Sequence, residues 1–203
     1  MDDRLKNFIT FSLIVIFIAT IAILIIIIYP EEEGKKPIQI EFKEPPKAGW
    51  DNLPGDKNIG TEVGQTAPNF VLDDVMNVTL NLTSRRGGVV IIEFITTDCV
   101  FCINQTQELK KVYNKYKDKW LAIFTIDLKK EDTIIELIDF KDKYGDQWYF
   151  GIDTTGEIAK RYKIGLGVPV LYILDINGKI GYKKIGLARS DELSNEVSKI
   201  GGY

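Results

Sequence analysis

The stretch VVIIEFITTDCVFC, residues 89–102, decides the fold of this chain. Its first part, Val89–Ile95, is apolar except for one acid, which is typical of a central strand buried on both faces. Cys99 and Cys102 follow, and a helical pattern begins after Cys99. The apolar positions of that helix are spaced i, i+3, i+4 and i+7, at Leu109, Val112, Tyr113 and Tyr116. Both cysteines are therefore expected where a buried strand gives way to a helix.

Alternating strands and helices are expected on both sides of this stretch. Strands are predicted at 70–72, 78–80, 120–126, 170–175 and 179–185, and helices at 131–144, 157–162 and 190–200. The first of these helices, 131–144, is expected to bury Ile134, Leu137 and Ile138. Asn177-Gly178 predicts a tight hairpin turn. This order predicts an α/β domain over 61–203, with a mixed central sheet flanked by helices.

The N-terminal part of the chain predicts a membrane anchor. After a short tail, 1–7, the segment 8–29 carries no charged residue, and its 22 positions would span about 33 Å as a helix. The apolar run is longer than that of a signal peptide and is followed by no A-x-A-like cleavage site, so we expect a retained transmembrane helix. Residues 30–60 hold five of the seven prolines, among glycines and charges, and are expected to form a linker.

The composition excludes several classes of function. The chain contains no histidine, which removes Ser-His-Asp and Cys-His catalysis and any metal site that needs imidazole, including a copper site. Its only two cysteines lie in one CxxC, too few thiolates for a zinc or iron–sulfur site. The net charge of −3 offers no basic field for nucleic acid. We expect neither a metal nor a bound cofactor.

The position of the CxxC at the start of a helix indicates a reactive thiol pair. Free N–H groups and the helix dipole favour an anion there, so a thiolate at Cys99 is stabilised. Cys102, one turn into the helix, would be shielded and would resolve a mixed disulfide formed at Cys99. A purely structural disulfide is the alternative, but a bridge that closes so short a loop removes little entropy from the unfolded chain.

The residues also carry a family resemblance. The stretch 89–102, followed by GVPVLYILDINGKI at 167–180, resembles the thioredoxin superfamily. The opening VGQTAPNFVLDD at 63–74 is most similar to its membrane-tethered TlpA/ResA-type branch. The resemblance implies a thioredoxin fold in which Pro169 is cis and lies against the disulfide, and in which Val168 offers its backbone to an extended substrate.

Glu93 is the one acid within the strand Val89–Ile95, at a position where thioredoxins carry a buried acid beneath the second cysteine. Burial should raise its pKa and suit it to proton exchange with Cys102. A structural lysine partner, or a strand edge open to water, is the alternative. The sequence departs from the family at Asp98, usually tryptophan, and at Phe101, commonly proline. A carboxylate at position 98 should oppose formation of the neighbouring thiolate.

The resemblance implies a membrane-tethered thiol–disulfide oxidoreductase. Its partners would be protein thiols and disulfides together with an electron donor or acceptor. We expect a single-pass protein of the cell membrane with its redox domain on the extracytoplasmic side, where disulfides persist. A peroxiredoxin-like thiol peroxidase is an alternative, because the A-P-x-F opening is shared and Thr96 precedes Cys99 by three residues; however, Ile92 stands where that motif has proline. A non-catalytic thioredoxin-fold interaction module is the other alternative.

Overall fold

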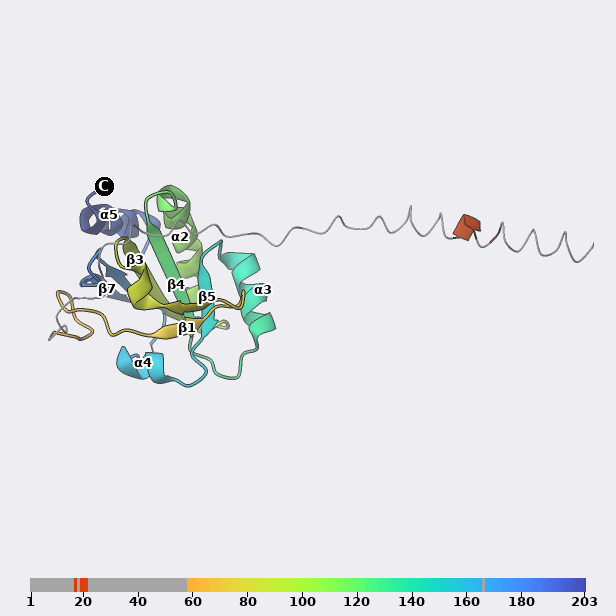
Figure 1. Ribbon diagram of the computed structural model, residues 1–203, viewed down its shortest axis with the longest axis horizontal. Coiled ribbons are helices and arrows are strands. Elements are labelled where there is room, and N and C mark those ends of the chain that lie inside the picture. The colour runs from red at the N-terminus through yellow and green to blue at the C-terminus, as the bar shows by residue number, and fades with distance from the viewer. Residues whose placement is uncertain (1–16, 18, 22–57, 166) are drawn as a thin grey trace, which may run out of the picture. The chain divides into compact units, whose positions relative to one another are not determined.

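The computed structural model describes residues 17, 19–21, 58–165 and 167–203 (Figure 1). The expected tail and nearly all of the expected membrane span lie outside the described residues, as does the linker up to residue 57. Phe17 and residues 19–21 are helical. Among the residues described, no helix has the length and apolar character needed to cross a membrane. The described residues from 58 to 203 belong to one compact unit.

A five-stranded mixed sheet forms the centre of this domain, in the order β5-β4-β3-β6-β7 (Figure 1). The strands β3, β4 and β5 are parallel to one another, whereas β6 and β7 are antiparallel to their neighbours. Their bounds are Val89–Ile95 for β3, Leu121–Asp127 for β4, Tyr149–Ile152 for β5, Val170–Leu174 for β6 and Ile180–Ile185 for β7. The predicted mixed sheet is confirmed.

The strand β3 occupies the middle of the sheet, and all seven of its residues are buried. Its neighbours fix the register: Glu93 lies opposite Thr125 of β4 on one side and Leu171 of β6 on the other. Because side chains alternate across a strand, Glu93 faces the same side of the sheet as Ile91 and Ile95. The apolar run in the sequence therefore corresponds to a strand that is covered on both faces, as predicted.

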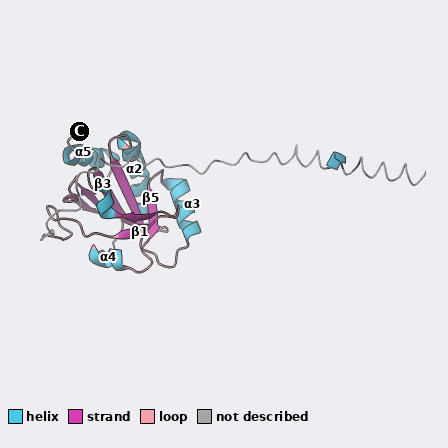
Figure 2. Cartoon of the chain, in the orientation of Figure 1, coloured by secondary structure: helices cyan, strands magenta, loops and turns pink. Residues whose placement is uncertain are grey.

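Three helices cover the face of the sheet to which Glu93 points (Figure 2). They are α2 at Val100–Tyr116, α3 at Ile134–Tyr144 and α5 at Ser190–Gly201. The helix α2 packs Leu109, Val112 and Tyr116 against this face, as its periodicity predicted. Cys102 belongs to the same apolar cluster, so the second cysteine lies inside the core rather than on the surface.

A small hairpin and a short helix cover the opposite face. The hairpin pairs β1, Val71–Asp73, with β2, Thr79–Asn81, and leads into the 3₁₀ helix η2 at Leu82–Arg85. The helix α4, Glu157–Arg161, lies on the same side. Aromatic rings fill the space between these elements and the sheet, with edge or tilted contacts among Phe70, Phe94, Phe124, Tyr162 and Tyr172. Such pairs contribute beyond their buried area.

Two sequence expectations differ from the structure. The strand β5 was not predicted; its four residues include Gly151, onto which the carbonyl oxygen of Asp73 packs so closely that a Cβ there would lie 2.5 Å away. The expected burial of Ile134 is wrong, because this side chain is 60% exposed. The helix α3 begins only at Ile134, after a capping box formed by Thr133 and Glu136, and it turns Leu137 and Phe140 towards the core instead.

Candidate active site

The two cysteines form a disulfide at the first turn of α2. Cys99 is the N-cap residue, and its Sγ accepts a hydrogen bond from the backbone N–H of Cys102 at 3.1 Å. Cys99 is half-buried, whereas Cys102 is completely buried. The strand-to-helix junction inferred from the sequence is therefore confirmed, and only the sulfur of Cys99 lies in a residue that solvent reaches. A negative charge on that sulfur would be stabilised by the N–H group and by the helix dipole.

The loop that precedes β6 approaches this disulfide from another part of the chain. The peptide bond between Val168 and Pro169 is cis, as the family resemblance implies. The carbonyl oxygen of Val168 lies 3.8 Å from the Sγ of Cys99. Pro169 is buried, and its own carbonyl accepts a hydrogen bond from the N–H of Gly186 at 2.8 Å. The sequence-predicted residues Cys99, Val168 and Pro169 thus meet at one place, where Cys99 and Val168 are half-buried and Pro169 is buried.

The carboxyl group of Glu93 is fully buried beneath α2. Burial raises the pKa of Glu93 to about 7, against the opposing effect of hydrogen bonds with two threonine hydroxyls. Those partners are Thr125 of β4, at 2.7 Å from Oε2, and Thr106 of α2, at 3.0 Å from Oε1. Neither alternative from the sequence applies, because β3 is a central strand and the hydrogen-bond partners of Glu93 are hydroxyl groups, not a lysine.

The hydrogen bonds around Glu93 leave a place for one proton on its carboxyl group. The indole N–H of Trp148 donates to Thr125 Oγ1 at 2.9 Å, so the hydroxyl proton of Thr125 is free to reach Glu93. Thr106 Oγ1 lies 3.0 Å from Glu93 Oε1 and 3.0 Å from the carbonyl oxygen of Cys102, but its hydroxyl carries only one proton. Every contact is satisfied when Glu93 is neutral, donates to Thr106, and Thr106 donates to Cys102.

A second group of polar residues holds the loop that precedes Cys99. Lys129 Nζ lies 3.3 Å from Asp98 and 3.0 Å from Asp132, and the hydroxyl of Thr97 donates to Asp132. Hydrogen bonds from Thr96 and Lys129, with the positive charge of Lys129, lower the pKa of Asp98. Asp98 was expected to oppose formation of the Cys99 thiolate. The positive charge of Lys129, which the sequence analysis did not place beside Asp98, counteracts this effect.

Asp127, at the end of β4, is a further buried acid close to this loop. Burial and the neighbouring Asp132 raise the pKa of Asp127 to about 7. Its Oδ1 accepts the backbone N–H of Lys129 at 3.0 Å. Sequence reasoning missed this residue, although an acid at the end of an apolar strand is the same signal that singled out Glu93.

The supporting residues of Glu93 were also missed. Thr106 lies four residues after Cys102 on the same helix, so helical spacing alone places it above the same part of the sheet. Thr125 becomes a neighbour of Glu93 through the pairing of β3 with β4, and Trp148 reaches Thr125 through the pairing of β4 with β5, neither of which the sequence states. In the described part of the chain, no cluster of three or more His, Cys, Asp or Glu residues could hold a metal ion.

Residues 63–183, more than half of the chain, match the sequence model of the AhpC/TSA family. The chain belongs to the AhpC/TSA family. Curated proteins that are similar to this chain include thiol-disulfide oxidoreductases named ResA. The protein of Bacillus anthracis is 28% identical over 139 residues, which cover 68% of this chain and 79% of the relative. The protein of Geobacillus kaustophilus is 25% identical over 138 residues, which cover 68% and 78%.

Solved structures share the fold of this AhpC/TSA family member. The thioredoxin domain of a thiol-disulfide oxidoreductase from Bacteroides vulgatus superposes with a TM-score of 0.61 at 24% identity, covering 69% of this chain and 98% of that one. A secreted disulfide oxidoreductase of Mycobacterium tuberculosis gives 0.57 at 20% identity, covering 64% and 95%. The thioredoxin-like fold is confirmed. With its CxxC disulfide and its ResA relatives, this family member is a thiol–disulfide oxidoreductase.

The burial of Glu93 predicts a pH-dependent loss of stability. The folded state holds a proton on Glu93 up to about pH 7, whereas the unfolded chain releases it near pH 4.5, so stability falls as pH rises between these values. Above pH 7 the buried charge of Glu93 lowers the free energy of unfolding by about 3 kcal/mol, the free-energy equivalent of its pKa shift. Glu93→Gln should therefore be about 2–3 kcal/mol more stable than wild type at pH 8 and nearly equal to it at pH 4.

Urea unfolding at a series of pH values measures this difference. Asp127 titrates in the same pH range. The free energy of unfolding of the Glu93→Gln variant should therefore still fall with pH, but less steeply than that of wild type. Glu131→Gln, at an exposed position, is the matched control and should leave the curve unchanged. A Glu93→Gln variant that is less stable than wild type at pH 8 would contradict the prediction.

Proposed function

We propose that this protein is a membrane-tethered enzyme that exchanges disulfides with protein substrates through Cys99 and Cys102. The observation that carries the proposal is the position of the disulfide: the sulfur of the half-buried Cys99 caps α2 and lies beside the carbonyl of Val168, while Cys102 is completely buried in the core. That asymmetry suits a pair of thiols with different tasks. The Cys99–Cys102 disulfide is itself the redox centre, and no bound cofactor is required.

In the reducing direction, the Cys99 thiolate attacks one sulfur of a substrate disulfide. A bond forms between Cys99 Sγ and that sulfur, the substrate S–S bond breaks, and the first substrate thiolate leaves. The N–H of Cys102 and the dipole of α2 stabilise the attacking thiolate. Cys99 is the residue for this step because Cys102 is completely buried and out of reach of a protein substrate.

Cys102 then attacks Cys99 Sγ, which restores the intramolecular disulfide and releases the second substrate thiolate. The thiol of Cys102 must lose a proton in this step, and Glu93 is the acceptor that we propose. The Glu93 carboxyl lies across the Thr106 hydroxyl from the backbone of Cys102, and its pKa of about 7 allows it to accept a proton near neutrality. The hydrogen bonds of the disulfide form fit a neutral Glu93, as expected immediately after such a transfer.

Val168 and Pro169 form the part of the surface on which we propose that the substrate lies. The loop that contains them comes within 3.8 Å of Cys99 Sγ, at the carbonyl oxygen of Val168. A backbone carbonyl in this place accepts a hydrogen bond from the N–H of an extended substrate segment. Such a contact holds the substrate cysteine beside Cys99 without regard to its neighbouring side chains, which suits an enzyme that acts on protein thiols and disulfides.

The tether and the location extend the proposal to residues that the structure does not describe. The uncharged segment 8–29 is long enough to span a bilayer as a single helix, and the proline-rich residues 30–60 would separate it from the catalytic domain. We place the redox domain on the extracytoplasmic side, because stable protein disulfides are found there. An electron donor or acceptor in the same compartment or membrane would recycle Cys99 and Cys102.

The division of labour between the two cysteines predicts which variant traps a substrate. Cys102→Ser can attack but not resolve, so it should accumulate a mixed disulfide when the full chain is incubated with insulin. Cys99→Ser should accumulate little, because its remaining thiol is buried. Non-reducing electrophoresis measures both adducts. Equal trapping by the two variants would show that the assignment is wrong, and rapid peroxide consumption without insulin reduction would favour a thiol peroxidase instead.

The role of Glu93 predicts a selective kinetic defect. Glu93→Gln keeps the size of the side chain and its hydrogen bonds to Thr106 and Thr125 but cannot accept a proton. Resolution of the mixed disulfide should become about 10²-fold slower, the lower end of the usual contribution of general base catalysis, while attack by Cys99 should be nearly unchanged. Rapid-quench trapping separates the two steps. Unchanged resolution over pH 6 to 8 would remove Glu93 from the mechanism.

The proposed topology predicts the result of proteolysis on intact cells. A protease added from outside should cleave within 30–60 and release the redox domain, since a proline-rich linker exposes its backbone. The measurement is an immunoblot for a tag placed after Tyr203, with a cytoplasmic protein as the control for lysis. Protection of the domain until the cells are lysed would place it in the cytoplasm and overturn the assigned side of the membrane.

A further inference from the structure

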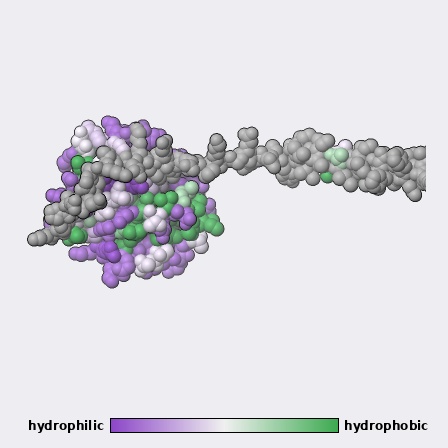
Figure 3. Space-filling model, viewed as in Figure 1, coloured by the Kyte–Doolittle hydropathy of each residue, from purple (hydrophilic) through white to green (hydrophobic). Residues whose placement is uncertain are grey.

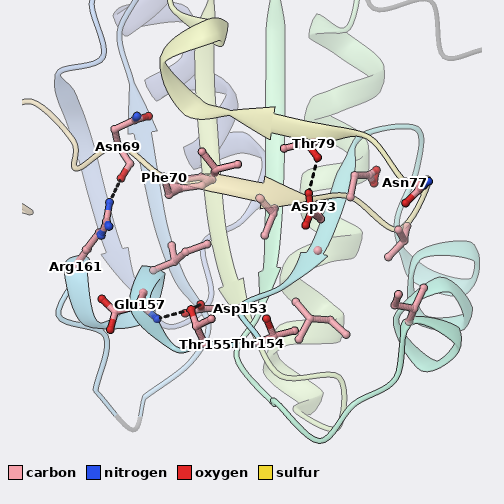
Figure 4. Close-up of a pocket in the computed structure, with 18 residues that line it drawn as sticks. Asn69, Phe70, Asp73, Asn77, Thr79, Asp153, Thr154, Thr155, Glu157 and Arg161 are labelled. Atoms are coloured by element: carbon pink, nitrogen blue, oxygen red, sulfur yellow. Dashed lines mark hydrogen bonds between the residues drawn. The ribbon is translucent and has the colours of Figure 1, made fainter.

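A hollow of about 800 Å³ lies between the β1–β2 hairpin, the end of β5 and α4 (Figure 4), and neither cysteine lines it. Its size is within the range of ligand-binding sites, about 300–1,000 Å³. The lining includes Val71 and Asp73 of β1, Ile152 and Asp153 at the end of β5, and Glu157 at the start of α4. None of these residues takes part in the proposed thiol chemistry, so the hollow requires an explanation of its own.

One wall of the hollow is a strand edge. The hydrogen bonds between β1 and β2 include Leu82 N to Phe70 O and Asp74 N to Val78 O, each at 3.0 Å. In an antiparallel pair, alternate residues bond to the partner and the residues between them turn their N–H and C=O groups away. Val71 and Asp73 are these intermediate residues, as their non-bonded pairing with Asn81 and Thr79 requires. Their backbone groups therefore point to the free side of β1.

The free side of β1 is closed at both ends and open at Val71 and at the N–H of Asp73, whereas the carbonyl of Asp73 packs against Gly151. At one end the carbonyl oxygen of Asn69 accepts a hydrogen bond from Arg161 at 2.9 Å. At the other end the N–H of Val75 donates to the carbonyl of Phe150 at 2.8 Å. Between them, within the described part of the chain, the N–H groups of Val71 and Asp73 and the carbonyl of Val71 have no protein hydrogen-bond partner. Hydrogen-bonding groups at this spacing match one type of ligand, an extended polypeptide.

The side chains around the edge define the chemistry of that polypeptide. Four carboxyl groups and one basic side chain line the hollow, namely those of Asp73, Asp74, Asp153 and Glu157, with Arg161. Asp74 and Asp153 are buried and accept backbone N–H groups, so the exposed carboxylates are those of Asp73 and of Glu157, the latter 3.6 Å from Lys160. Large aliphatic side chains are exposed beside them, at Val71, Met76, Val78, Ile134 and Ile135. Figure 3 shows hydrophobic residues gathered on this face, over β1 and α3. An exposed apolar group of this kind is typical of an interaction site.

We propose that this groove binds an extended segment of a protein partner that carries alternating basic and aliphatic side chains, paired as an added strand with the free edge of β1. Backbone hydrogen bonds to Val71 and Asp73 hold the segment, and its basic side chains face the carboxylates of Asp73 and Glu157. This mode of recognition adds a strand to an existing sheet edge, with alternate side chains turned towards and away from the protein.

The position of the groove connects it with the redox site. The strands β3, β4 and β5 are parallel, so their carboxyl ends lie at the same edge of the sheet. Cys99 follows the end of β3, and Asp153 follows the end of β5, where its N–H bonds to the carbonyl of Asp127 at 2.9 Å. The disulfide belongs to the α2 face and the groove to the opposite face, so a partner that occupies both must cross this edge of the sheet. The identity of the partner as a redox substrate rests on the proposed function, whereas the binding of the segment does not.

Fluorescence anisotropy tests the groove with the full chain in neutral detergent micelles. The probe is a labelled peptide of four Lys-Val repeats, compared with one of four Glu-Val repeats. The Lys-Val peptide should bind at least fivefold more tightly. Val71→Pro removes the outward N–H without breaking a hydrogen bond of the hairpin, and should weaken binding about fivefold, the effect of about one backbone hydrogen bond. Val71→Thr keeps the N–H and is the matched control, with less than a twofold change expected.

Each outcome of this experiment either supports or overturns the proposal. Absence of binding by the Lys-Val peptide, equal binding of the Glu-Val peptide, or unchanged binding to Val71→Pro would overturn the proposal. Should Val71→Pro fail to fold, the double variant Asp73→Asn with Glu157→Gln decides instead: an unchanged affinity for the Lys-Val peptide overturns the proposal, and a weakened one supports it. Exchange with hydroxyethyl disulfide is measured in parallel. A wild-type protein that binds the peptide but exchanges no disulfide would refute the proposed function and leave the groove in place.

Discussion

A carboxyl group that is sealed inside the central strand must find its hydrogen bonds within the protein, and much of this structure follows from that constraint. Glu93 is completely buried, and two threonine hydroxyls from different elements reach it. Those contacts require β4 to pair with β3 in one register and α2 to cross above them at one height. A shift of either element by a single residue would leave a buried polar group unpaired, which costs more than the bond contributes.

The same constraint ties the disulfide to the core. Thr106 touches both Glu93 and the carbonyl of Cys102, so the first turns of α2 are fixed by the sheet below them as well as by the disulfide. The loop before Cys99 is held separately, by the ion pairs of Lys129 with Asp98 and Asp132. Cys99 therefore lies between two rigid supports, one buried and one at the surface. Preorganisation of this kind keeps a reactive sulfur in place before any substrate arrives.

The sequence predicted the parts of this arrangement that are local. The apolar run of β3, the CxxC at the start of α2 and the isolated acid Glu93 are all visible as patterns along the chain. The parts that depend on pairing between distant segments could not be predicted in this way. Thr125 supports Glu93 because β4 lies beside β3, and Trp148 supports Thr125 because β5 lies beside β4. The strand β5 itself is short and includes a glycine, so it resembles a loop in sequence.

Between the two cysteines lie Val100 and Phe101, whose side chains are 67% and 64% exposed. Because they bury little surface, exchanging them costs the folded state little, while the cysteines on either side are held by the helix and the core. Substitutions at these two positions can therefore accumulate, by chance or by selection, with little effect on the rest of the chain. One scaffold can in this way give rise to descendants that differ in redox potential and in the partners they meet, without passing through a poorly folded ancestor.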